Sequence, residues 1–376
     1  MSIVLTSPSV IAPGNAVDHG LAGALRQLGS GHTPVAVVSN GPRPAWFAGE
    51  FPGDAVTFVQ RQGRQDGTII ADLSKEFEIP CHDFLVLGAI DEDVQMAKNG
   101  RGVLLSAGWL PLSPAARYGI SVLTAEEFLA VVKLVESWPG SWYFEGSEPL
   151  YAVRALTNVS GMNVTDAQAA WAKRVVNAVK NGGPRLQALL VVGARSLLQS
   201  GGDSTHDLMF GLYPSSGSAN NDTEVLSDFT HRLRTTTSRV RFAKKATPLL
   251  IRHVASTKRS RGGVTDRADP REQIETLHLN PFYRGKVTGR HVILLDDCTT
   301  YGVSFGVAAS LLRAAGAEAV TCVALGKFGN QLRYFEIALT GDPFAPVAAG
   351  NYTVTSRPFA GVRHNEAQSA LQELIK

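Results

Sequence analysis

The sequence predicts an α/β protein with two doubly wound parallel-sheet domains joined by a helical connector. Short apolar runs alternate with helical patterns along most of the chain, which favours parallel sheets covered by helices. The chain has 376 residues, a length typical of two domains. Apolar residues make up 44% of it and charged residues 18%, so each domain can form a hydrophobic core. We place the domains at residues 1–122 and 186–376, with a connector or lid at 123–185.

The first domain is expected to alternate short buried strands with helices. The expected strands are Ser2–Thr6, Pro34–Ser39, Phe84–Leu87 and Gly102–Leu105. The expected helices are Val17–Leu28 and Asp91–Lys98. The strand runs are short and continuously apolar, whereas the helical runs carry apolar residues at helical spacing.

The connector is expected to hold two helices. Thr124 and Glu127 have the spacing of a capping box and precede an apolar stripe that begins at Phe128. The Trp-Pro-Gly-Ser run at 138–141 ends that helix. A second helix is expected to open at 163–166 and to stop at an Asn-Gly-Gly-Pro run that ends at Pro184.

The second domain is expected to return to the α/β pattern. Its expected strands are Asp207–Tyr213, Pro248–Val254, Val292–Leu295 and Ala319–Leu325. Its expected helices are Thr223–Leu233, Gly306–Ala314 and Glu366–Ile375. Beyond Gly341, only the last of these helices has a pattern that can be assigned.

Composition and charge exclude several classes of protein. The formal net charge of +3 is too small to indicate nucleic-acid binding on its own. Cys81, Cys298 and Cys322 have no spacing typical of a disulfide framework or a zinc site. The sequence has no signal peptide and no apolar run of the roughly 20 residues that a membrane helix needs. We therefore expect a cytoplasmic protein that does not bind membranes.

The most informative segment is Val292–Ser304, with the sequence VILLDDCTTYGVS. An apolar strand ends in Asp296 and Asp297, and a loop of small and polar residues then leads into a helix. The carboxylates can accept hydrogen bonds from neighbouring hydroxyls, and the loop can hold a phosphate at the positive end of the helix. These features indicate a site for a phosphorylated sugar. An ordinary strand-to-helix turn is the alternative, although two adjacent acids repel each other unless a ligand or cation uses them.

This segment resembles the phosphoribosyl pyrophosphate (PRPP) signature of type I phosphoribosyltransferases. The resemblance covers most of residues 190–330 and implies a parallel sheet that binds PRPP at the carboxyl ends of its strands. It implies that Asp296 and Asp297 are catalytic and bind the ribose 2- and 3-hydroxyls. It also implies a 5-phosphate loop formed by Thr299, Thr300, Tyr301, Gly302 and Ser304. For Tyr301, packing of the side chain over the phosphate pocket is an equal alternative.

Two further segments are assigned from their positions in this resemblance. Ser215, Ser216 and Gly217 lie between a strand and a helix, where the family has its pyrophosphate loop. A plain surface turn has the same composition. Lys258 and Arg259 lie where the family has a mobile catalytic loop, whose cations neutralise the departing pyrophosphate. A solvated basic loop is the alternative for these two residues.

The resemblance implies an enzyme, a magnesium-dependent pentosyltransferase with PRPP as substrate. Magnesium pyrophosphate would leave ribose C1 through an oxocarbenium-like state, and a nitrogen nucleophile would capture the sugar. The Mg²⁺ ion would be held mostly by substrate and water, reaching Asp296 or Asp297 only through ribose or water. Enzymes for hypoxanthine and guanine place a general-base Asp where this chain has Thr300, which disfavours that class of acceptor. The identity of the acceptor is otherwise open, and so is the question of whether the protein forms a homodimer.

The first domain resembles haloacid-dehalogenase (HAD) phosphatases over about residues 1–120. Ser39 matches their second motif, Phe84–Asp93 matches their fourth, and Lys75 falls near the position of the third-motif lysine. The first motif lacks its two aspartates, because Thr-Ser-Pro-Ser stands at 6–9. A serine cannot form an aspartyl-phosphate or hold magnesium as a carboxylate does. We therefore expect a degenerate HAD-like domain without phosphatase activity.

Structural roles are favoured for the polar residues of this domain, with Ser39, Asp91 and Asp93 as helix caps and surface acids. Chains of this architecture resemble the phosphoribosyltransferase and HAD components of tellurium-resistance-type stress operons. Two other functions stay open. One is a non-catalytic sensor of PRPP or nucleotides that binds nucleic acid through basic clusters at 232–245 and 258–271, which the low net charge disfavours. The other is a HAD-type phosphohydrolase.

Overall fold

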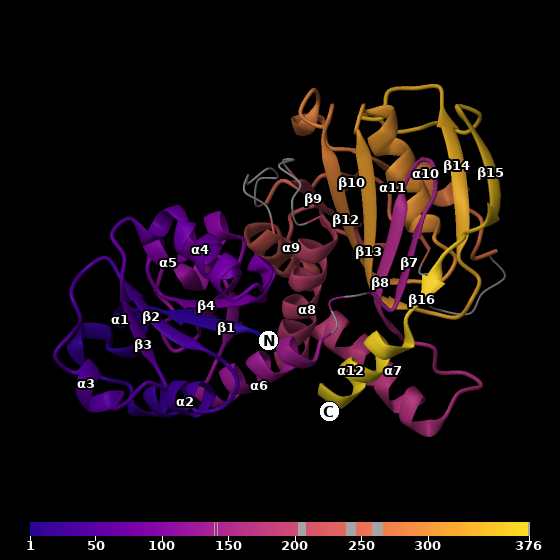
Figure 1. Cartoon of the computed structure of the whole chain (residues 1–376). Coiled ribbons are helices and arrows are strands. Elements are labelled where there is room, and N and C mark those ends of the chain that lie inside the picture. The colour runs from indigo at the N-terminus through magenta and orange to yellow at the C-terminus, as the bar shows by residue number, and fades with distance from the viewer. Residues whose placement is uncertain (139, 141, 202–207, 238–245, 258–265, 375–376) are drawn as a thin grey trace.

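The computed structural model describes residues 1–374 except 139, 141, 202–207, 238–245 and 258–265. It contains two six-stranded sheets, each with helices packed against it. In Figure 1 the first sheet and its helices are indigo to purple, and the second sheet runs from magenta to yellow. The predicted α/β class is confirmed. Among the described residues, no helix is both long enough and apolar enough to cross a bilayer.

The first sheet is entirely parallel, in the order β3-β2-β1-β4-β5-β6. Its strands are β1 (Ile3–Thr6), β2 (Val35–Ser39), β3 (Thr57–Gln60), β4 (Phe84–Gly88), β5 (Val103–Ala107) and β6 (Ile120–Val122). The inner strands β1, β4 and β5 are buried along their whole length, which explains their unbroken apolar runs. The sequence does not predict β3, which is partly exposed, or β6, which has only 3 residues.

Helices pack on both faces of the first sheet, because residues of β1 alternate between two separate hydrophobic clusters. The α-helices are α1 (Pro8–Ile11), α2 (His19–Gly29), α3 (Phe47–Glu50), α4 (Thr68–Glu76), α5 (Asp91–Gly100) and α6 (Ala125–Ser137). Short 3₁₀ turns lie at η1 (Pro13–Asn15), η2 (Arg64–Asp66), η3 (Cys81–Asp83) and η4 (Ala115–Arg117). Thr124 caps α6 by accepting a hydrogen bond from the Glu127 amide at 3.1 Å, as the sequence predicts.

The second sheet is mixed, in the order β16-β7-β8-β13-β12-β9. Its strands are β7 (Phe144–Ser147), β8 (Ala152–Asn158), β9 (Leu208–Leu212), β12 (His291–Thr299), β13 (Ala319–Lys327) and β16 (Val362–Arg363). Strands β8, β13, β12 and β9 are parallel, whereas β7 runs antiparallel to β8, and β16 runs antiparallel to β7. The expectation of a wholly parallel second sheet is therefore wrong at this edge. Residues 148–151 leave room only for a chain reversal, and such a short connection makes antiparallel neighbours.

The region expected to be a helical connector, 123–185, supplies two strands of the second sheet. It contains α6 and α7 (Asp166–Asn181) as predicted, but β7 and β8 lie between them. The sequence signal for β7 is weak, because its residues Phe-Glu-Gly-Ser are mostly polar. In β8, Val153, Ala155 and Leu156 are buried, and the pattern is too short to separate from a helical one.

The remaining elements surround the second sheet. The helices are α8 (Pro184–Gly201), α9 (Val225–Thr237), α10 (Arg271–Thr276), η5 (Pro281–Tyr283), α11 (Val303–Ala314) and α12 (Asn365–Leu374). Two antiparallel pairs complete the fold, β10 (Leu250–Arg252) with β11 (Leu277–Leu279), and β14 (Arg333–Leu339) with β15 (Tyr352–Pro358). The β14 strand packs closely on α11, because a Cβ atom at Gly306 would lie 2.6 Å from the Phe335 side chain.

The two sheets share one hydrophobic cluster. Its members include Val4 and Leu105 of the first sheet, Leu190 of α8 and Leu295 of the second sheet. Polar contacts join the same parts, since Arg195 of α8 donates to Asp83 Oδ1 through Nε and Nη2, at 2.9 and 2.6 Å. Arg232 of α9 donates to the carbonyl oxygens of Ala116 and Gly119. Helices α8 and α9 therefore link the second sheet to the first.

Candidate functional site

Two loops meet at the carboxyl edge of the second sheet. Strands β12 and β9 are parallel neighbours, with Leu295 paired to Leu212, and the Tyr213 amide donates to the Leu295 carbonyl at 2.8 Å. Asp296 and Asp297 directly follow Leu295, and the 214–218 turn directly follows Tyr213. Ligands of parallel α/β sheets usually bind at this edge. The fold thus brings the predicted acid pair and the predicted pyrophosphate loop together.

Asp296 and Asp297 both keep intermediate exposure. The Asp297 amide donates to Asp296 Oδ1 at 2.8 Å, and the Cys298 amide donates to Asp297 Oδ1 at 2.5 Å. Desolvation of its carboxyl group raises the pKa of Asp296 well above the usual range, and the neighbouring Asp297 carboxylate raises it further. A hydrogen bond from the Ser304 side chain opposes this shift in pKa. Asp296 therefore holds a proton unusually tightly unless donors or a cation compensate its charge.

Gly302 makes the turn between β12 and α11. Its φ is 79°, in the left-handed region that favours glycine. A Cβ atom here would lie 2.9 Å from the carbonyl oxygen of Arg333, so the approach of β14 also requires a glycine. The Arg333 amide donates to the Tyr301 carbonyl at 3.0 Å and fixes the loop. The first amides of α11 follow directly, and because they have no intrahelical acceptors they can bind an anion.

The other residues of the predicted 5-phosphate loop differ in exposure. Thr299 ends β12 and is buried, and its carbonyl accepts from the Phe328 amide at 2.8 Å. Thr300 and Ser304 keep intermediate exposure. The Tyr301 side chain packs against a hydrophobic cluster, which favours the packing alternative for this residue. The accessible donors of the loop are therefore its backbone, Thr300 and Ser304.

Residues 213–218 form a compact turn after β9. The Ser218 amide donates to the Ser215 carbonyl at 3.2 Å, which closes the turn around Ser216 and Gly217. Gly217 is exposed, and a Cβ atom placed on it would have no neighbour within 4 Å. Within the part of the chain that the structure describes, the amides of Ser216 and Gly217 donate to no protein acceptor. Two adjacent donors thus face open space.

Three successive carbonyl groups of this turn accept hydrogen bonds from residues outside it. Arg252 donates to the carbonyls of Pro214, through Nη2 at 3.2 Å, and Ser215, through Nε at 2.7 Å. The Ser256 amide donates to the next carbonyl at 2.9 Å. In a trans peptide group, the carbonyl and the following amide point in opposite directions. The amides of 215–217 therefore point away from these partners, which is the arrangement of an anion-binding nest.

One of the three amides already has an anionic partner. The Ser215 amide lies 3.3 Å from each carboxylate oxygen of Glu224, and Ser215 Oγ lies 3.1 Å from Glu224 Oε1. A carboxylate accepts hydrogen bonds from the same donors that a phosphate oxygen would use. The turn therefore holds an anion of its own chain at its first amide and leaves the next two amides open.

Lys258 and Arg259, the predicted cations of the pyrophosphate site, lie outside the described residues. The chain before them is described to Thr257, whose amide donates to Glu272 Oε1 at 2.7 Å. Ser256 contacts the 213–218 turn directly. The segment that leads to Lys258 and Arg259 therefore begins in contact with the 213–218 turn.

Lys327 is a buried cation next to Thr299 that sequence reasoning misses. It ends β13, where it pairs in register with Thr299. It is 1% exposed, its Nζ donates to the Gly329 carbonyl, and it lies 5.0 Å from the Phe144 ring. Burial lowers the pKa of this amine to about 8, and Arg363 contributes to the shift. The signal that could identify Lys327 is its position just after the apolar run Ala319–Leu325, the strand that follows the signature segment in the sequence.

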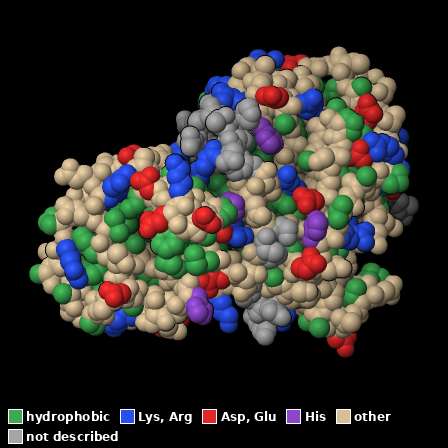
Figure 2. All heavy atoms as spheres, viewed as in Figure 1, with side chains coloured by type: hydrophobic (Ala, Val, Ile, Leu, Met, Phe, Trp, Pro, Cys, Tyr) green, Lys and Arg blue, Asp and Glu red, His purple; other side chains and the backbone are tan. Residues whose placement is uncertain are grey.

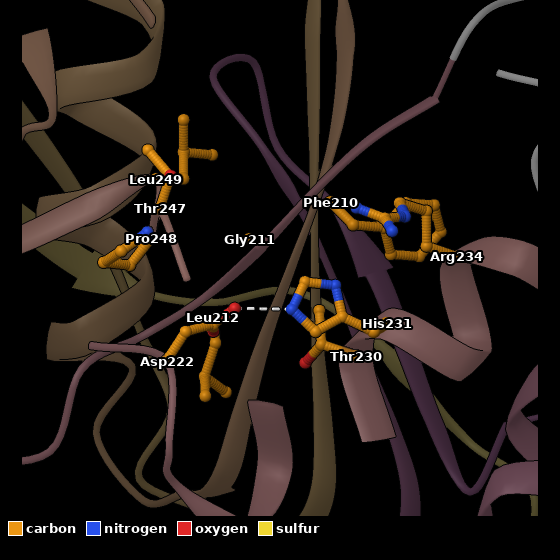
Figure 3. A pocket seen from close by; sticks show the side chains of 10 residues that line it. All are labelled: Phe210, Gly211, Leu212, Asp222, Thr230, His231, Arg234, Thr247, Pro248 and Leu249. Carbon is orange, nitrogen blue, oxygen red and sulfur yellow. Dashed lines mark hydrogen bonds and ion pairs between the residues drawn. The ribbon is translucent and has the colours of Figure 1, made fainter. Parts of the chain in front are cut away.

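A small pocket lies between β9 and α9. Its lining residues are Phe210, Gly211, Leu212, Asp222, Thr230, His231, Arg234, Thr247, Pro248 and Leu249. His231 Nε2 contacts Asp222 Oδ2 at 2.5 Å (Figure 3). The Ala246 amide donates to the same oxygen at 3.1 Å. Burial raises the pKa of Asp222, but hydrogen bonds from His231 and Ala246 outweigh it and leave the pKa below its usual range. This ion pair ties the chain after the turn to α9.

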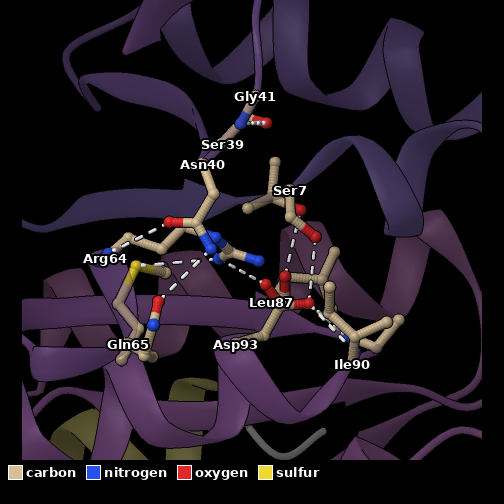
Figure 4. A network of polar contacts seen from close by, with 12 residues as sticks. Ser7, Ser39, Asn40, Gly41, Arg64, Gln65, Leu87, Ile90 and Asp93 are labelled. Atoms are coloured by element: carbon tan, nitrogen blue, oxygen red, sulfur yellow. Dashed lines mark hydrogen bonds and ion pairs between the residues drawn. The ribbon is translucent and has the colours of Figure 1, made fainter. Parts of the chain in front are cut away.

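The carboxyl edge of the first sheet holds a second polar cluster (Figure 4). Asp93 in the first turn of α5 is fully buried, and Arg64 Nη1 lies 2.5 Å from its Oδ1. Asp93 Oδ2 accepts from Ser7 Oγ at 2.9 Å and from the amides of Ala89 and Ile90 at 2.8 and 3.1 Å. The Arg64 guanidinium thus neutralises a carboxylate that has no access to water.

This cluster corrects one expectation for the first domain. Asp93 caps a helix, as the sequence favours, but it is buried and is therefore not a surface acid. Asp91 is exposed, as expected of a surface acid. Lys75 is exposed on α4, and its assignment as the third-motif lysine stays a prediction, whereas Arg64 is a cation that contacts the buried Asp93. Ser39 has a local role, since its Oγ accepts from the Gly41 amide at 3.0 Å.

Among the described residues, no group of three or more His, Cys, Asp or Glu side chains is placed to hold a metal ion. The carboxylates of Asp296 and Asp297 could bind Mg²⁺ only together with oxygens from a ligand or water. No family model matches the chain, and neither the curated proteins nor the solved structures contain a significant match.

Proposed function

We propose that this protein is a phosphoribosyltransferase that transfers ribose 5-phosphate from PRPP to a nitrogen nucleophile and releases pyrophosphate. One observation carries the proposal: Asp296 and Asp297 lie at the same sheet edge as two anion-binding turns. One turn leads through Gly302 into α11, and the other presents the amides of 215–217. PRPP has a matching order of groups, with a phosphate at one end, a diol in the middle and a pyrophosphate at the other end.

Each part of the site has a defined role in this reaction. The ribose hydroxyls donate to the carboxylates of Asp296 and Asp297, and the 5-phosphate accepts from the first amides of α11. The open amides of Ser216 and Gly217 stabilise the negative charge that grows on the departing pyrophosphate. The two carboxylates stabilise the positive charge that develops on the ribose ring. Magnesium enters as part of the PRPP complex.

The raised pKa of Asp296 supports a ligand site over an ordinary strand-to-helix turn. Two neighbouring carboxylates in a desolvated position are unfavourable for the free protein. Two hydroxyl donors and a nearby cation would relieve this, and groups with such perturbed pKa values are typical of functional sites. Thr300 in place of a general-base aspartate supports an acceptor other than hypoxanthine or guanine. We retain Lys258 and Arg259 as proposed cations of the pyrophosphate site.

The first domain is proposed to be catalytically inactive. Ser7 follows β1 where a nucleophilic aspartate is needed, and it donates to Asp93 instead. The Asp93 carboxylate is itself paired with Arg64 in the interior. These contacts support a structural role for a cluster that in an active HAD phosphatase would bind substrate and metal.

The charge distribution on one face of the molecule supports a small-molecule substrate. On the face in Figure 2, basic and acidic side chains are interspersed over both halves. Nucleic-acid binding proteins concentrate Lys and Arg on a patch or stripe. The mixed charges of this face fit a small-molecule substrate, whereas most of the basic clusters at 232–245 and 258–271 lies outside the described residues.

Incubation with PRPP, Mg²⁺ and a library of nucleobases and amines tests the proposal. We expect mass spectrometry to detect one ribosyl-phosphate adduct together with released pyrophosphate. The Asp296→Asn, Asp297→Asn double variant is the control and should form neither. Binding of PRPP without any adduct would contradict the transferase and favour the sensor. Absence of PRPP binding would reject both.

A further inference from the structure

We propose that Arg252 is the positioning residue of the pyrophosphate turn, and that it supplies the buried positive charge beneath it. The inference rests on the proposed function, because pyrophosphate is the ligand of this turn. Arg252 ends β10 and is 4% exposed. Its side chain reaches the two carbonyl groups, those of Pro214 and Ser215, that set the direction of the first two nest amides.

The guanidinium of Arg252 is fixed on its other edge as well. Nη1 donates to Thr276 Oγ1 at 2.9 Å, and Nη2 donates to Gln273 Oε1 at 2.9 Å. Both partners lie in α10 and are buried. The planar fork of arginine can grip acceptors on two sides at once, which a lysine ammonium on a flexible stem cannot do. The carbonyls of the turn are therefore held against a rigid element.

Asn220 completes the contact from the opposite direction. Its Nδ2 donates to the Arg252 carbonyl at 2.9 Å, and its Oδ1 accepts from the Arg252 amide at 2.9 Å. The side chain of Asn220 thus pairs with the β10 backbone, while the side chain of Arg252 pairs with the backbone of the turn. This reciprocal arrangement fixes the position of the turn relative to β10 at two separate points.

The charge of Arg252 has no counter-ion among the residues that the structure describes. All its acceptors are neutral: two carbonyls, a hydroxyl and an amide oxygen. A buried cation is unfavourable unless an anion compensates it. A pyrophosphate on the far side of the same peptide groups would provide that compensation. The Glu224 carboxylate already lies at the first of these amides, and an anionic ligand at the next two amides would complete the compensation.

Binding measurements with three ligands separate this role from a general structural one. We expect Arg252→Met to weaken the binding of inorganic pyrophosphate and of PRPP about tenfold or more. Methionine cannot hold the carbonyls of the turn in place, and it removes the positive charge beneath the bound anion. Ribose 5-phosphate, which contacts only the acid pair and α11, should bind within about twofold of the wild type. Arg252→Lys should recover only part of the loss. The exposed Arg284, changed to Lys, is the control and should alter none of the three affinities.

Asn220→Gly provides a second variant that keeps the charge of Arg252 and tolerates the positive φ of 53° at this position. It should also weaken pyrophosphate more than ribose 5-phosphate, and it decides the question if Arg252→Met does not fold. Equal losses for pyrophosphate and ribose 5-phosphate, or no loss in either variant, would overturn the role of Arg252. Failure of the wild type to bind ribose 5-phosphate or PRPP would instead reject the proposed function.

Discussion

The backbone amide of Asp297 donates a hydrogen bond to the carboxylate of Asp296, 2.8 Å away. The second acid of the pair thereby orients the first, while its own carboxylate raises the pKa of that first acid. The unliganded site therefore holds a carboxyl group that is aligned for accepting hydrogen bonds and yet disfavours its charged form. This combination is unfavourable for stability and useful for binding a diol.

We expect Asp296→Asn to stabilise the unliganded protein near pH 7. A carboxyl with a raised pKa keeps a proton in the folded state that the unfolded chain releases, so wild-type stability falls as pH rises above about 4. Asparagine has no such proton. The difference in free energy of unfolding should be smallest at about pH 4 and should grow as the pH rises toward 7. Urea denaturation at both pH values measures it, and a difference that does not change with pH contradicts the account.

We expect Glu224→Gln to strengthen the binding of pyrophosphate. The Glu224 carboxylate now accepts from the Ser215 amide and hydroxyl, and its negative charge repels an anion at the adjacent amides. Glutamine keeps an acceptor oxygen but removes the charge. The gain should be severalfold, or about 1 kcal/mol at this partly exposed position. Titration calorimetry measures it, with Asp72→Asn on α4 as the charge-matched control, and weaker binding by the Gln variant would count against the nest.

We expect Arg64→Met to destabilise the protein strongly. It would leave the Asp93 carboxylate buried without a cation, which typically costs about 3–5 kcal/mol. Adding Asp93→Asn should recover part of the loss, because asparagine can still accept from Ser7 and the amides of the α5 start. Thermal and urea unfolding of the single and double variants give the coupling free energy between Arg64 and Asp93. Strictly additive losses would show that Arg64 and Asp93 do not act as a pair.

Much of the fold follows from local sequence patterns. The buried strands β1, β4 and β5 appear as apolar runs, and the cap at Thr124 follows from its spacing to Glu127. The β14–β15 pair could not be predicted in the same way. Its outer strand carries apolar residues on one face only at Tyr352 and Val354 and is exposed and polar beyond them, so the alternation is too short to assign. The strand forms because it pairs with β14, a long-range contact that no local pattern contains.

The same contrast between local patterns and long-range contacts applies to the candidate site. The acid pair and Gly302 follow from the signature, since one segment contains the strand, the acids and the helix start. Arg64 could not be assigned from the sequence, because it is a basic residue in a polar stretch. Arg252 lies in the predicted strand Pro248–Val254, where no local pattern indicates that its side chain reaches the 213–218 turn. Spacing along the chain does not determine which cation reaches the interior, and Arg64 is the one that pairs with the buried Asp93.

Calorimetric titration of PRPP with Mg²⁺ into the wild type and into the Asp296→Asn, Asp297→Asn variant tests the central claim most directly. The account predicts a measurable affinity for the wild type and its loss in the variant, with the far-UV circular dichroism of the two proteins unchanged. Equal affinity in both proteins would contradict it, because the diol of the sugar would then be held by other residues.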